Sequence, residues 1–312
     1  MQVELSKSEV LERILHLRSF PGIGDAPISA LNHLAENAQE ITFKKGEVIF
    51  EEGKAGQTLY FVLDGMISLR HGKKTVHRVH GNEMLGALSV FAPNQPSPQA
   101  LVEQDCFCLK IDGRTFYDVL EENFPLMLIT LRGMILELIT TRRLSGPDAL
   151  FKEQLCALPQ SKEPMGLFEK ILLLNKSLVF ASSQVDTITQ LARNAHEYHF
   201  KPGVTLWEEK DSSTDFFILV KGQVEGRNER QSFTFGPGDA VGVLDAMAGV
   251  PRWYSARSKN QCVALHLTLE SVWDVLEDNP EMGIHLIEAI AIQIIDLRRF
   301  FADHFGTRSI WA

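Results

Sequence analysis

The feature of this sequence that most limits its fold is an internal repeat. Residues from 34 onward and residues from 191 onward match at a constant offset of 157 without a gap. The matched positions include Phe43 and Phe200, Gly46 and Gly203, Phe50 and Trp207, Tyr60 and Phe217, Gly65 and Gly222, and Arg70 and Arg227. Self-similarity of this length is the mark of a duplicated structural unit. The sequence therefore predicts two copies of one domain.

The repeat sets the predicted domain boundaries. We expect a first domain over residues 1–143, a second over 165–312, and a linker over 144–164 between them. The linker is marked by turn-forming residues, namely Gly146, Pro147, Pro159 and Pro164. A short helix is expected within it, over 148–158. Because the chain has 312 residues and 45% of them are hydrophobic, both domains can bury a core.

Each copy begins and ends with sequence that is typical of helices. Ser6 and Glu9 form a capping box before the first helical stretch. Apolar residues at helical spacing follow in both copies: Ile28, Leu31 and Leu34 in the first, and Val185, Ile188 and Leu191 in the second. We expect these side chains to pack against a sheet. Near the end of each copy, wider apolar stripes over 127–138 and 284–295 predict a further helix.

Between these helices the apolar residues alternate as in strands. Short apolar runs are separated by turns at Lys45-Gly46, Asp64-Gly65 and His71-Gly72, and the second copy repeats this pattern. Several short strands at intervals of roughly 8 to 12 residues are typical of a small antiparallel barrel or jelly roll. The predicted fold class is mixed α and β: two tandem jelly-roll β-barrels, each flanked by N-terminal and C-terminal helices.

One stretch of the second copy resembles a known ligand-binding motif. Residues 238–244 read G-D-A-V-G-V-L, and Pro251 and Arg252 follow after a spacer. This resembles the phosphate-binding cassette of the cyclic nucleotide-binding domain family, whose pattern is G-D-x-x-G-E-L-A-L and then P-R-x-A-T. In that family a short helix presents backbone N–H groups to the cyclic phosphate, the arginine pairs with the phosphate, and the glutamate holds the ribose 2′-hydroxyl. The resemblance covers nearly all of both copies and implies a cyclic nucleotide-binding-like jelly roll in each.

The resemblance implies a set of ligand-binding residues in the second copy: Gly242, Val243, Leu244, Arg252, Trp253 and Ser255. Three departures from the family pattern weaken this site. Val243 replaces the glutamate and cannot accept a hydrogen bond from a ribose hydroxyl. Asp245 replaces a small alanine and brings a negative charge close to the phosphate position. Trp253 and Tyr254 replace small residues and are large enough to fill the pocket.

The first copy departs further from the family pattern. Its corresponding residues are Gly86, Ala87, Leu88 and Gln99. Ala87 replaces the glutamate, and Pro98-Gln99 replaces the Pro-Arg step after a longer spacer. A neutral glutamine cannot form the charge-assisted pair that makes phosphate binding strong. We therefore expect no cyclic nucleotide in the first domain.

Three functional hypotheses follow. The leading one is a non-catalytic regulatory or scaffold protein whose two ligand sites are degenerate. The alternative is a genuine receptor for cAMP or cGMP that binds through Arg252 in the second domain. The third is a cupin-like metalloenzyme, because cupins share this barrel shape. Metal ligands there alternate as H-x-H, whereas His77 and His80 are three apart and point to opposite faces of a strand.

The motifs of common enzyme classes are missing from the sequence. It contains no Walker A loop, no G-x-S-x-G elbow and no H-E-x-x-H motif. We therefore expect no enzyme activity, no metal and no cofactor other than the cAMP or cGMP of the alternative hypothesis.

Composition and chain length limit the expected partners. A net charge of −9 and a pI near 5.6 give no basic surface of the kind that nucleic acid requires, so we expect no nucleic acid. The sequence reaches Ala312 without room for an output module, so we expect a protein partner. The apolar stripe over 284–295 also predicts a homodimer through the C-terminal helix.

Location is predicted from three negative features. The first eight residues lack the apolar core of a signal peptide, and no window approaches the ~18 uninterrupted apolar residues of a membrane span. The four cysteines lack C-x-x-C spacing, which is typical of buried thiols in a reducing compartment. We expect a cytoplasmic protein that does not bind a membrane.

Overall fold

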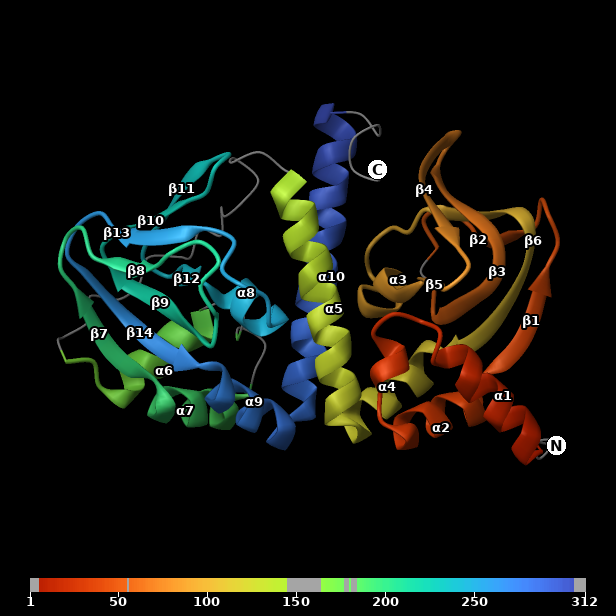
Figure 1. Ribbon diagram of the computed structural model, residues 1–312, viewed down its shortest axis with the longest axis horizontal. Helices are drawn as coiled ribbons and strands as arrows, with labels where there is room; N and C mark the ends of the chain where they lie inside the picture. Colours follow the sequence, from red (N-terminus) through yellow and green to blue (C-terminus); the bar gives the residue numbers. More distant parts are fainter. Residues whose placement is uncertain (1–5, 55, 145–163, 177–179, 181–183, 306–312) are drawn as a thin grey trace. The chain divides into compact units, whose positions relative to one another are not determined.

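The computed structural model describes residues 6–54, 56–144, 164–176, 180 and 184–305 (Figure 1). By its internal contacts the chain divides into two units. The first comprises Met1–Thr130 and Ile290–Ala312, and the second comprises Leu131–Ala289. The predicted linker lies almost entirely outside the described residues, and the short helix expected over 148–158 lies wholly outside them. The predicted domain boundaries stay a prediction.

The helices and strands of the first copy follow in chain order: α1 (Lys7–Leu17), the 3₁₀ helix η1 (Ile23–Asp25), α2 (Ile28–Asn37), β1 (Gln39–Phe43), β2 (Val48–Phe50), β3 (Thr58–His71), β4 (Lys74–His80), β5 (Glu83–Leu85), α3 (Ala87–Phe91), β6 (Gln99–Asp112), α4 (Gly113–Glu122) and α5 (Phe124–Leu144). Those of the second copy are α6 (Leu167–Lys176), α7 (Val185–Asn194), β7 (His196–Phe200), β8 (Thr205–Trp207), β9 (Asp215–Lys221), β10 (Val224–Arg227), β11 (Ser232–Phe235), β12 (Ala240–Val241), α8 (Val243–Ala248), β13 (Ser255–Ser258), β14 (Cys262–Thr268), α9 (Leu269–Asp278) and α10 (Pro280–Phe305). The division between the two units falls within α5 and within α10.

The predicted capping box is present at the start of α1. The Ser6 hydroxyl accepts from the Glu9 backbone N–H at 3.3 Å, and the Glu9 carboxylate accepts from the Ser6 backbone N–H at 2.7 Å. The expectation that every apolar residue of α2 and α7 packs against a sheet is wrong for Ile28 and Val185. They are 52% and 69% exposed. Each is the first residue of its helix, and helical side chains lean toward the N-terminus, so these two project past the packed turns.

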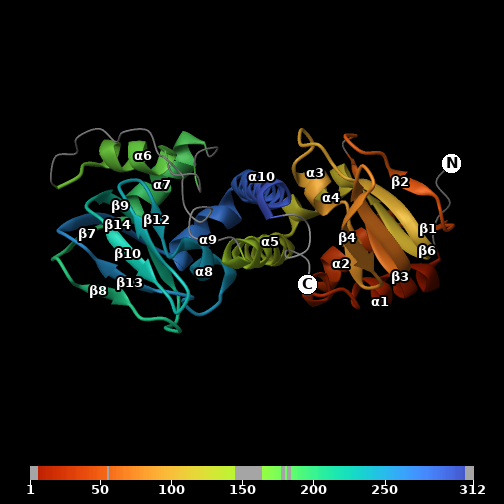
Figure 2. The same cartoon turned by 90° about the horizontal axis from the view of Figure 1, so that it is seen from above.

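The first unit contains a six-stranded antiparallel sheet in the order β1-β6-β3-β4, with β2 on β6 and β5 on β3 (Figures 1 and 2). β3 and β6 are each 14 residues long and pair along most of their length. Gly65 bends β3 with a φ of 102°, and a Cβ at this position would overlap the carbonyl oxygen of Asp105. Only glycine fits there, which explains why the bend recurs in the repeat.

The second unit repeats this plan with shorter strands. Gly222, the counterpart of Gly65, has a φ of 91° and separates β9 from β10. The strands form two four-stranded antiparallel sheets, in the orders β12-β9-β14-β7 and β11-β10-β13-β8. The predicted fold class is confirmed: two tandem jelly-roll domains of antiparallel strands with flanking helices.

The two barrels are filled by different side chains. The buried cluster of the first is Tyr60, Val62, Ile67, Val79, Leu85, Ala100, Val102, Cys106 and Cys108. That of the second is Trp207, Phe217, Leu219, Val224, Phe233, Phe235, Val241, Trp253, Tyr254, Ala256, Cys262 and Ala264. Six aromatic rings belong to the second cluster and one to the first. Aromatic side chains therefore make up a larger part of the second core than of the first.

Two of the long helices bear on earlier predictions. In the apolar stripe of α10, Ile284, Ile287, Ile290, Ala291 and Ile294 are each at most 7% exposed, and Ile295 is half-buried. The homodimer expected through this helix stays a prediction. Among the described residues, α5 is the helix long and apolar enough to cross a membrane, and 44% of its window is buried. A helix that is packed in a protein core can be equally long and apolar, so α5 is weak evidence for a membrane span.

Candidate functional site

The second cassette folds as a tight turn followed by a short helix. β12 leads into Gly242, which has a φ of 81°, and α8 begins at the next residue. A Cβ on Gly242 would overlap Nη1 of Arg252 and lie 2.8 Å from the Trp207 ring. Glycine is therefore required here by backbone conformation and by space. This close packing places the Arg252 guanidinium directly against the turn that starts the helix.

Arg252 points into the domain, and its side chain is 1% exposed. Nη1 donates to the Gly242 carbonyl at 2.7 Å, and Nη2 donates to the Asp215 carbonyl and, at 3.1 Å, to Asp215 Oδ1. The guanidinium carbon lies 4.1 Å from the centre of the Trp207 ring. Nε is buried and has no hydrogen-bond partner among the described residues. Both terminal nitrogens and one face of the guanidinium are therefore used inside the protein.

Two carboxylates balance the charge of Arg252. Asp245 Oδ2 lies 3.5 Å from Nη1, and the Asp245 side chain is 1% exposed. Asp215 is 36% exposed and is also hydrogen-bonded to Nε2 of His266 at 2.7 Å. A buried guanidinium needs an opposite charge, because an isolated charge in the interior is costly. Asp245 therefore places next to Arg252 the negative charge that the phosphate of a bound nucleotide would otherwise provide.

The aromatic residues of the cassette occupy the space around this ion pair. Tyr254 is 2% exposed, and its hydroxyl accepts from the Gly242 backbone N–H at 2.9 Å. Burial raises the pKa of Tyr254 well above its usual value, and the charge of Asp245 adds to this, so the phenol stays protonated. Trp253 stacks on Phe233 with ring centres 5.5 Å apart. The backbone N–H of Gly242, directly before α8, is therefore already hydrogen-bonded within the chain.

The remaining predicted residues of the second cassette have structural contacts. Val243 is 7% exposed and Leu244 is half-buried. The Ser255 hydroxyl donates to the Arg227 carbonyl at 3.1 Å, which joins β13 to β10. The structure thus brings Gly242 and Arg252 together, whereas it turns Ser255 toward a neighbouring strand.

The first cassette has the same backbone but different chemistry. Gly86 has a φ of 98°, α3 begins at Ala87, and a Cβ on Gly86 would overlap the Thr58 carbonyl oxygen. Ala87 and Leu88 are half-buried. Gln99 is the first residue of β6 and lies opposite Arg70 of β3. In place of the buried arginine and aspartate of the second cassette, this cassette has Gln99 and Ser89.

Comparison with protein families identifies the domain type. A family model described as "Cyclic nucleotide-binding domain" matches residues 40–123 and 197–279, which together make up more than half of the chain. The chain belongs to the cyclic nucleotide-binding domain family. The two matches confirm the tandem arrangement that the repeat predicted. No curated protein sequence matches the chain.

Several solved structures are similar at low identity. The regulatory subunit of a cAMP-independent protein kinase A from Trypanosoma brucei is 15% identical, with 98% of this chain and 93% of that chain covered and a TM-score of 0.36. The corresponding subunit from Trypanosoma cruzi, bound to guanosine, is 17% identical, with 90% and 91% covered and a TM-score of 0.35. A cyclic nucleotide-binding-like protein from Brucella abortus is 21% identical, with 35% and 98% covered and a TM-score of 0.31. The family assignment rests on the two family-model matches.

Two residues of the Arg252 network were not predicted from the sequence. Asp215, which pairs with Arg252, lies 37 residues before it in the chain, at the start of β9. His266, which is hydrogen-bonded to Asp215, lies on β14. No local pattern links these residues to the cassette. The repeat does hold one signal, because Asp215 corresponds to Thr58, whose carbonyl lies next to Gly86 in the first domain. Trp207 was visible in the same way, as the counterpart of Phe50.

The described histidines and cysteines were compared with the arrangement that a metal ion needs. In the part of the chain that the structure describes, no group of three or more His, Cys, Asp or Glu side chains is placed to hold an ion. His77 is half-buried, and burial, followed by the charge of Arg298, lowers its pKa. Cys106 and Cys108 are free and buried, and burial raises the pKa of the Cys108 thiol to about 12. Cys156 lies outside the described residues.

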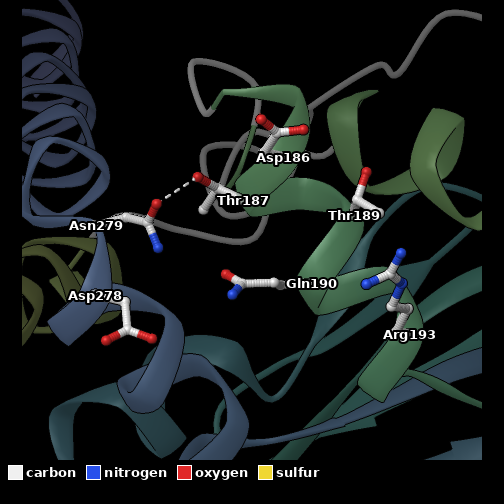
Figure 3. Close-up of a pocket in the computed structure, with 7 residues that line it drawn as sticks. All are labelled: Asp186, Thr187, Thr189, Gln190, Arg193, Asp278 and Asn279. Carbon is white, nitrogen blue, oxygen red and sulfur yellow. Dashed lines mark hydrogen bonds between the residues drawn. The ribbon is translucent and has the colours of Figure 1, made fainter.

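A polar pocket of about 420 Å³ lies away from the cassette, between α7 and the end of α9 (Figure 3). Its lining residues are Asp186, Thr187, Thr189, Gln190, Arg193, Asp278 and Asn279. The Thr187 hydroxyl donates to Asn279 at 2.9 Å. In the first domain His33 and Glu122, the counterparts of Gln190 and Asp278, approach to 3.4 Å across the same place. No sequence motif pointed to this pocket, and its residues form no nucleophile and base pair.

Proposed function

We propose that this chain is a non-catalytic regulatory or scaffold protein of the cyclic nucleotide-binding domain family, and that neither domain binds a cyclic nucleotide. The observation that carries the proposal is the inward position of Arg252, which is 1% exposed and paired with Asp215 and Asp245. In this family's binding pattern the strong contact to the phosphate is a charge-assisted pair with the arginine guanidinium. Here that pair is already made inside the protein.

The energy of opening the second site supports the proposal. For a phosphate to bind, Arg252 would have to leave Asp245, and a buried charge that loses its partner costs about 3–5 kcal/mol. The incoming phosphate would then meet the negative charge of Asp245 at short range. Val243 offers no acceptor for the ribose hydroxyl, so the nucleotide would lose that hydrogen bond as well. All three effects act against binding.

The first domain supports the same conclusion for a different reason. Gln99 is neutral, and Ala87 has no side-chain acceptor. The helix α3 has five residues, Ala87–Phe91, so its few backbone N–H groups would have to hold the phosphate without a guanidinium. A ligand held in this way lacks the stronger, charged class of hydrogen bond.

A regulatory protein without catalysis acts through another protein. We therefore include a protein partner in the proposal, together with the absence of enzyme activity. The absence of catalysis is supported by the second cassette, where Arg252, Tyr254 and Ser255 are hydrogen-bonded to backbone groups of the chain. Cytoplasmic location and the lack of nucleic-acid and membrane binding stay predictions of the sequence.

Isothermal titration of the full chain with cAMP and with cGMP tests the proposal. We expect no saturable heat for either nucleotide. The same titration on Arg252→Ala and on the exposed control Arg257→Ala separates the two hypotheses. Saturable binding by the unmodified chain that Arg252→Ala abolishes, and Arg257→Ala leaves intact, would overturn the proposal and establish a receptor that uses Arg252.

A further inference from the structure

One strand of the first unit has an open edge. β4 is the last strand in the order β1-β6-β3-β4, so it pairs with β3 on one side and with no described strand on the other. Figure 1 shows β3 and β4 as a hairpin. The backbone N–H and C=O groups along an open edge can pair with another extended segment. β4 is therefore a place where a second chain can add a strand.

The hairpin that carries this edge is basic. Residues 71–80 read H-G-K-K-T-V-H-R-V-H, with two lysines, one arginine, three histidines and no acidic residue. The whole chain, in contrast, has a net charge of −9. Lys73, Lys74 and Arg78 are exposed to solvent. The hairpin is thus a local concentration of positive charge on an acidic protein.

The first unit neutralises only part of this charge. At the turn, Glu52 lies 3.0 Å from His71 Nδ1 and accepts from the Gly72 backbone N–H at 2.9 Å. Glu103 on β6 accepts from Arg70 and from Arg78, at 3.0 Å each. Neither Lys73 nor Lys74 forms an ion pair with a described residue. The two lysines at the turn therefore remain available to an acidic partner.

The register of β4 places its side chains in a defined way. Arg78 lies opposite Ser68, and His80 lies opposite Met66. Val79, between them, is 2% exposed and belongs to the barrel core. Because side chains alternate along a strand, Arg78 and His80 project on the outer face. A strand added along β4 would present its own alternate side chains next to these two residues.

The strand at the same position in the second unit is also at a sheet edge, but it is short and carries no charge. β11, the last strand in the order β11-β10-β13-β8, is four residues long and contains no Lys, Arg or His. A longer basic edge is therefore not a requirement of the fold. Like charges also disfavour pairing between two copies of β4, whereas they favour a segment of opposite charge.

We propose that β4 binds an extended acidic segment of a partner protein by strand addition, with carboxylates at alternate positions facing Arg78 and His80 and further carboxylates near Lys73 and Lys74. This gives the kind of partner through which a regulatory protein would act. The proposal stands whether or not either cassette binds a nucleotide.

The test uses the full chain and a fluorescein-labelled peptide with alternating glutamate and valine residues. We expect saturable binding that weakens with added salt. Lys73→Glu/Lys74→Glu should weaken it by about tenfold or more. The matched control is Arg227→Glu/Arg230→Glu, which makes the same change in net charge at exposed positions of the second unit and should bind as the unmodified chain does.

A second peptide separates strand addition from simple charge attraction. It has the same sequence but N-methyl groups on alternate residues, so it keeps its charge and loses the N–H groups of one edge. We expect this peptide to lose binding. The proposal is overturned if the first peptide does not bind, if both double variants bind equally, or if the methylated peptide binds as well as the unmodified one. In those cases the role of the basic residues is only to disfavour pairing between the β4 strands of two copies of this chain.

Discussion

The two domains share a fold and differ in what surrounds the cassette glycine. In the second domain Gly242 lies against Arg252, and Asp245 is 3.5 Å from that arginine. In the first domain Gly86 lies against the Thr58 backbone, and the positions of the arginine and the aspartate are Gln99 and Ser89. The arginine and the buried carboxylate therefore occur together in one domain and are both replaced in the other. This teaches that Arg252 belongs to an internal ion pair.

A second difference concerns the barrel interiors. The glycines at the bends, Gly65 and Gly222, are kept in both domains because a Cβ would overlap backbone atoms there. The side chains inside the barrels are not kept in the same way, and aromatic rings fill the second. Backbone geometry and ligand chemistry are thus separate requirements. A cassette can keep its glycine turn while its pocket changes.

The largest expected difference in stability between the domains follows from replacing Arg252 in the second domain and Gln99 in the first. Arg252→Ala should lower the free energy of unfolding of the second unit by about 3–5 kcal/mol, because Asp245 stays buried without its partner. Gln99→Ala should cost about 1 kcal/mol or less. Urea unfolding followed by tryptophan fluorescence measures the loss in the second unit, where Trp207, Trp253 and Trp273 lie, and amide hydrogen exchange in β3 and β6 measures the loss in the first. Equal losses for the two variants would contradict the account.

A smaller effect is expected from the hydroxyl that covers the cassette turn. Tyr254→Phe leaves the buried Gly242 N–H without its acceptor, which costs about 1–3 kcal/mol. Tyr198→Phe is the matched control, because Tyr198 is 46% exposed. Thermal unfolding of both variants compares them. If the two melting temperatures fall equally, the Tyr254 hydroxyl does not hold the turn.

The smallest expected effect is a pH-dependent contribution to stability in the first domain that the second domain lacks. The hydrogen bond from Arg78, and after it the one from Arg70, holds the pKa of Glu103 below its ordinary value of 4.5. Because the folded-state pKa is depressed, this stabilisation is present above pH 4.5 and is lost as the pH falls through the lower folded-state value. The second domain has Lys259 at this place.

Glu103→Gln tests that expectation. It should destabilise the first unit by about 1 kcal/mol or less at neutral pH, and the difference from the unmodified chain should shrink on acidification. Amide hydrogen exchange in β3 and β6 at two pH values gives the readout. A difference that is the same at both pH values would exclude Glu103 as the source.

Much of the fold could be predicted from the sequence because the repeat and the turn glycines are local signals. The constant offset identified two domains, and Gly65 and Gly222 marked the strand bends. The change in the second pocket was also visible, since Val243 and Asp245 depart from the family pattern. The direction of the Arg252 side chain could not be predicted. It depends on Asp215, which is distant in sequence and reaches the cassette only when β9 packs beside α8.

The polar pocket and the open basic edge show the same limit. The pocket needs α7 and α9 to lie together, and its residues are separated by more than 80 positions in the chain. The charges of 71–80 could be read in the sequence, but their place on the last strand of a sheet could not. Tertiary pairing, which follows from the whole fold, decides both features.

The most direct test of the central claim observes the guanidinium itself. In ¹H–¹⁵N spectra of arginine side chains, assigned with Arg252→Lys, the buried and hydrogen-bonded N–H groups of Arg252 should exchange slowly with solvent. We predict that millimolar cAMP or cGMP leaves these signals unchanged, because the guanidinium stays in its internal ion pairs with Asp215 and Asp245. Saturable shifts of the Arg252 signals on addition of either nucleotide would contradict the account.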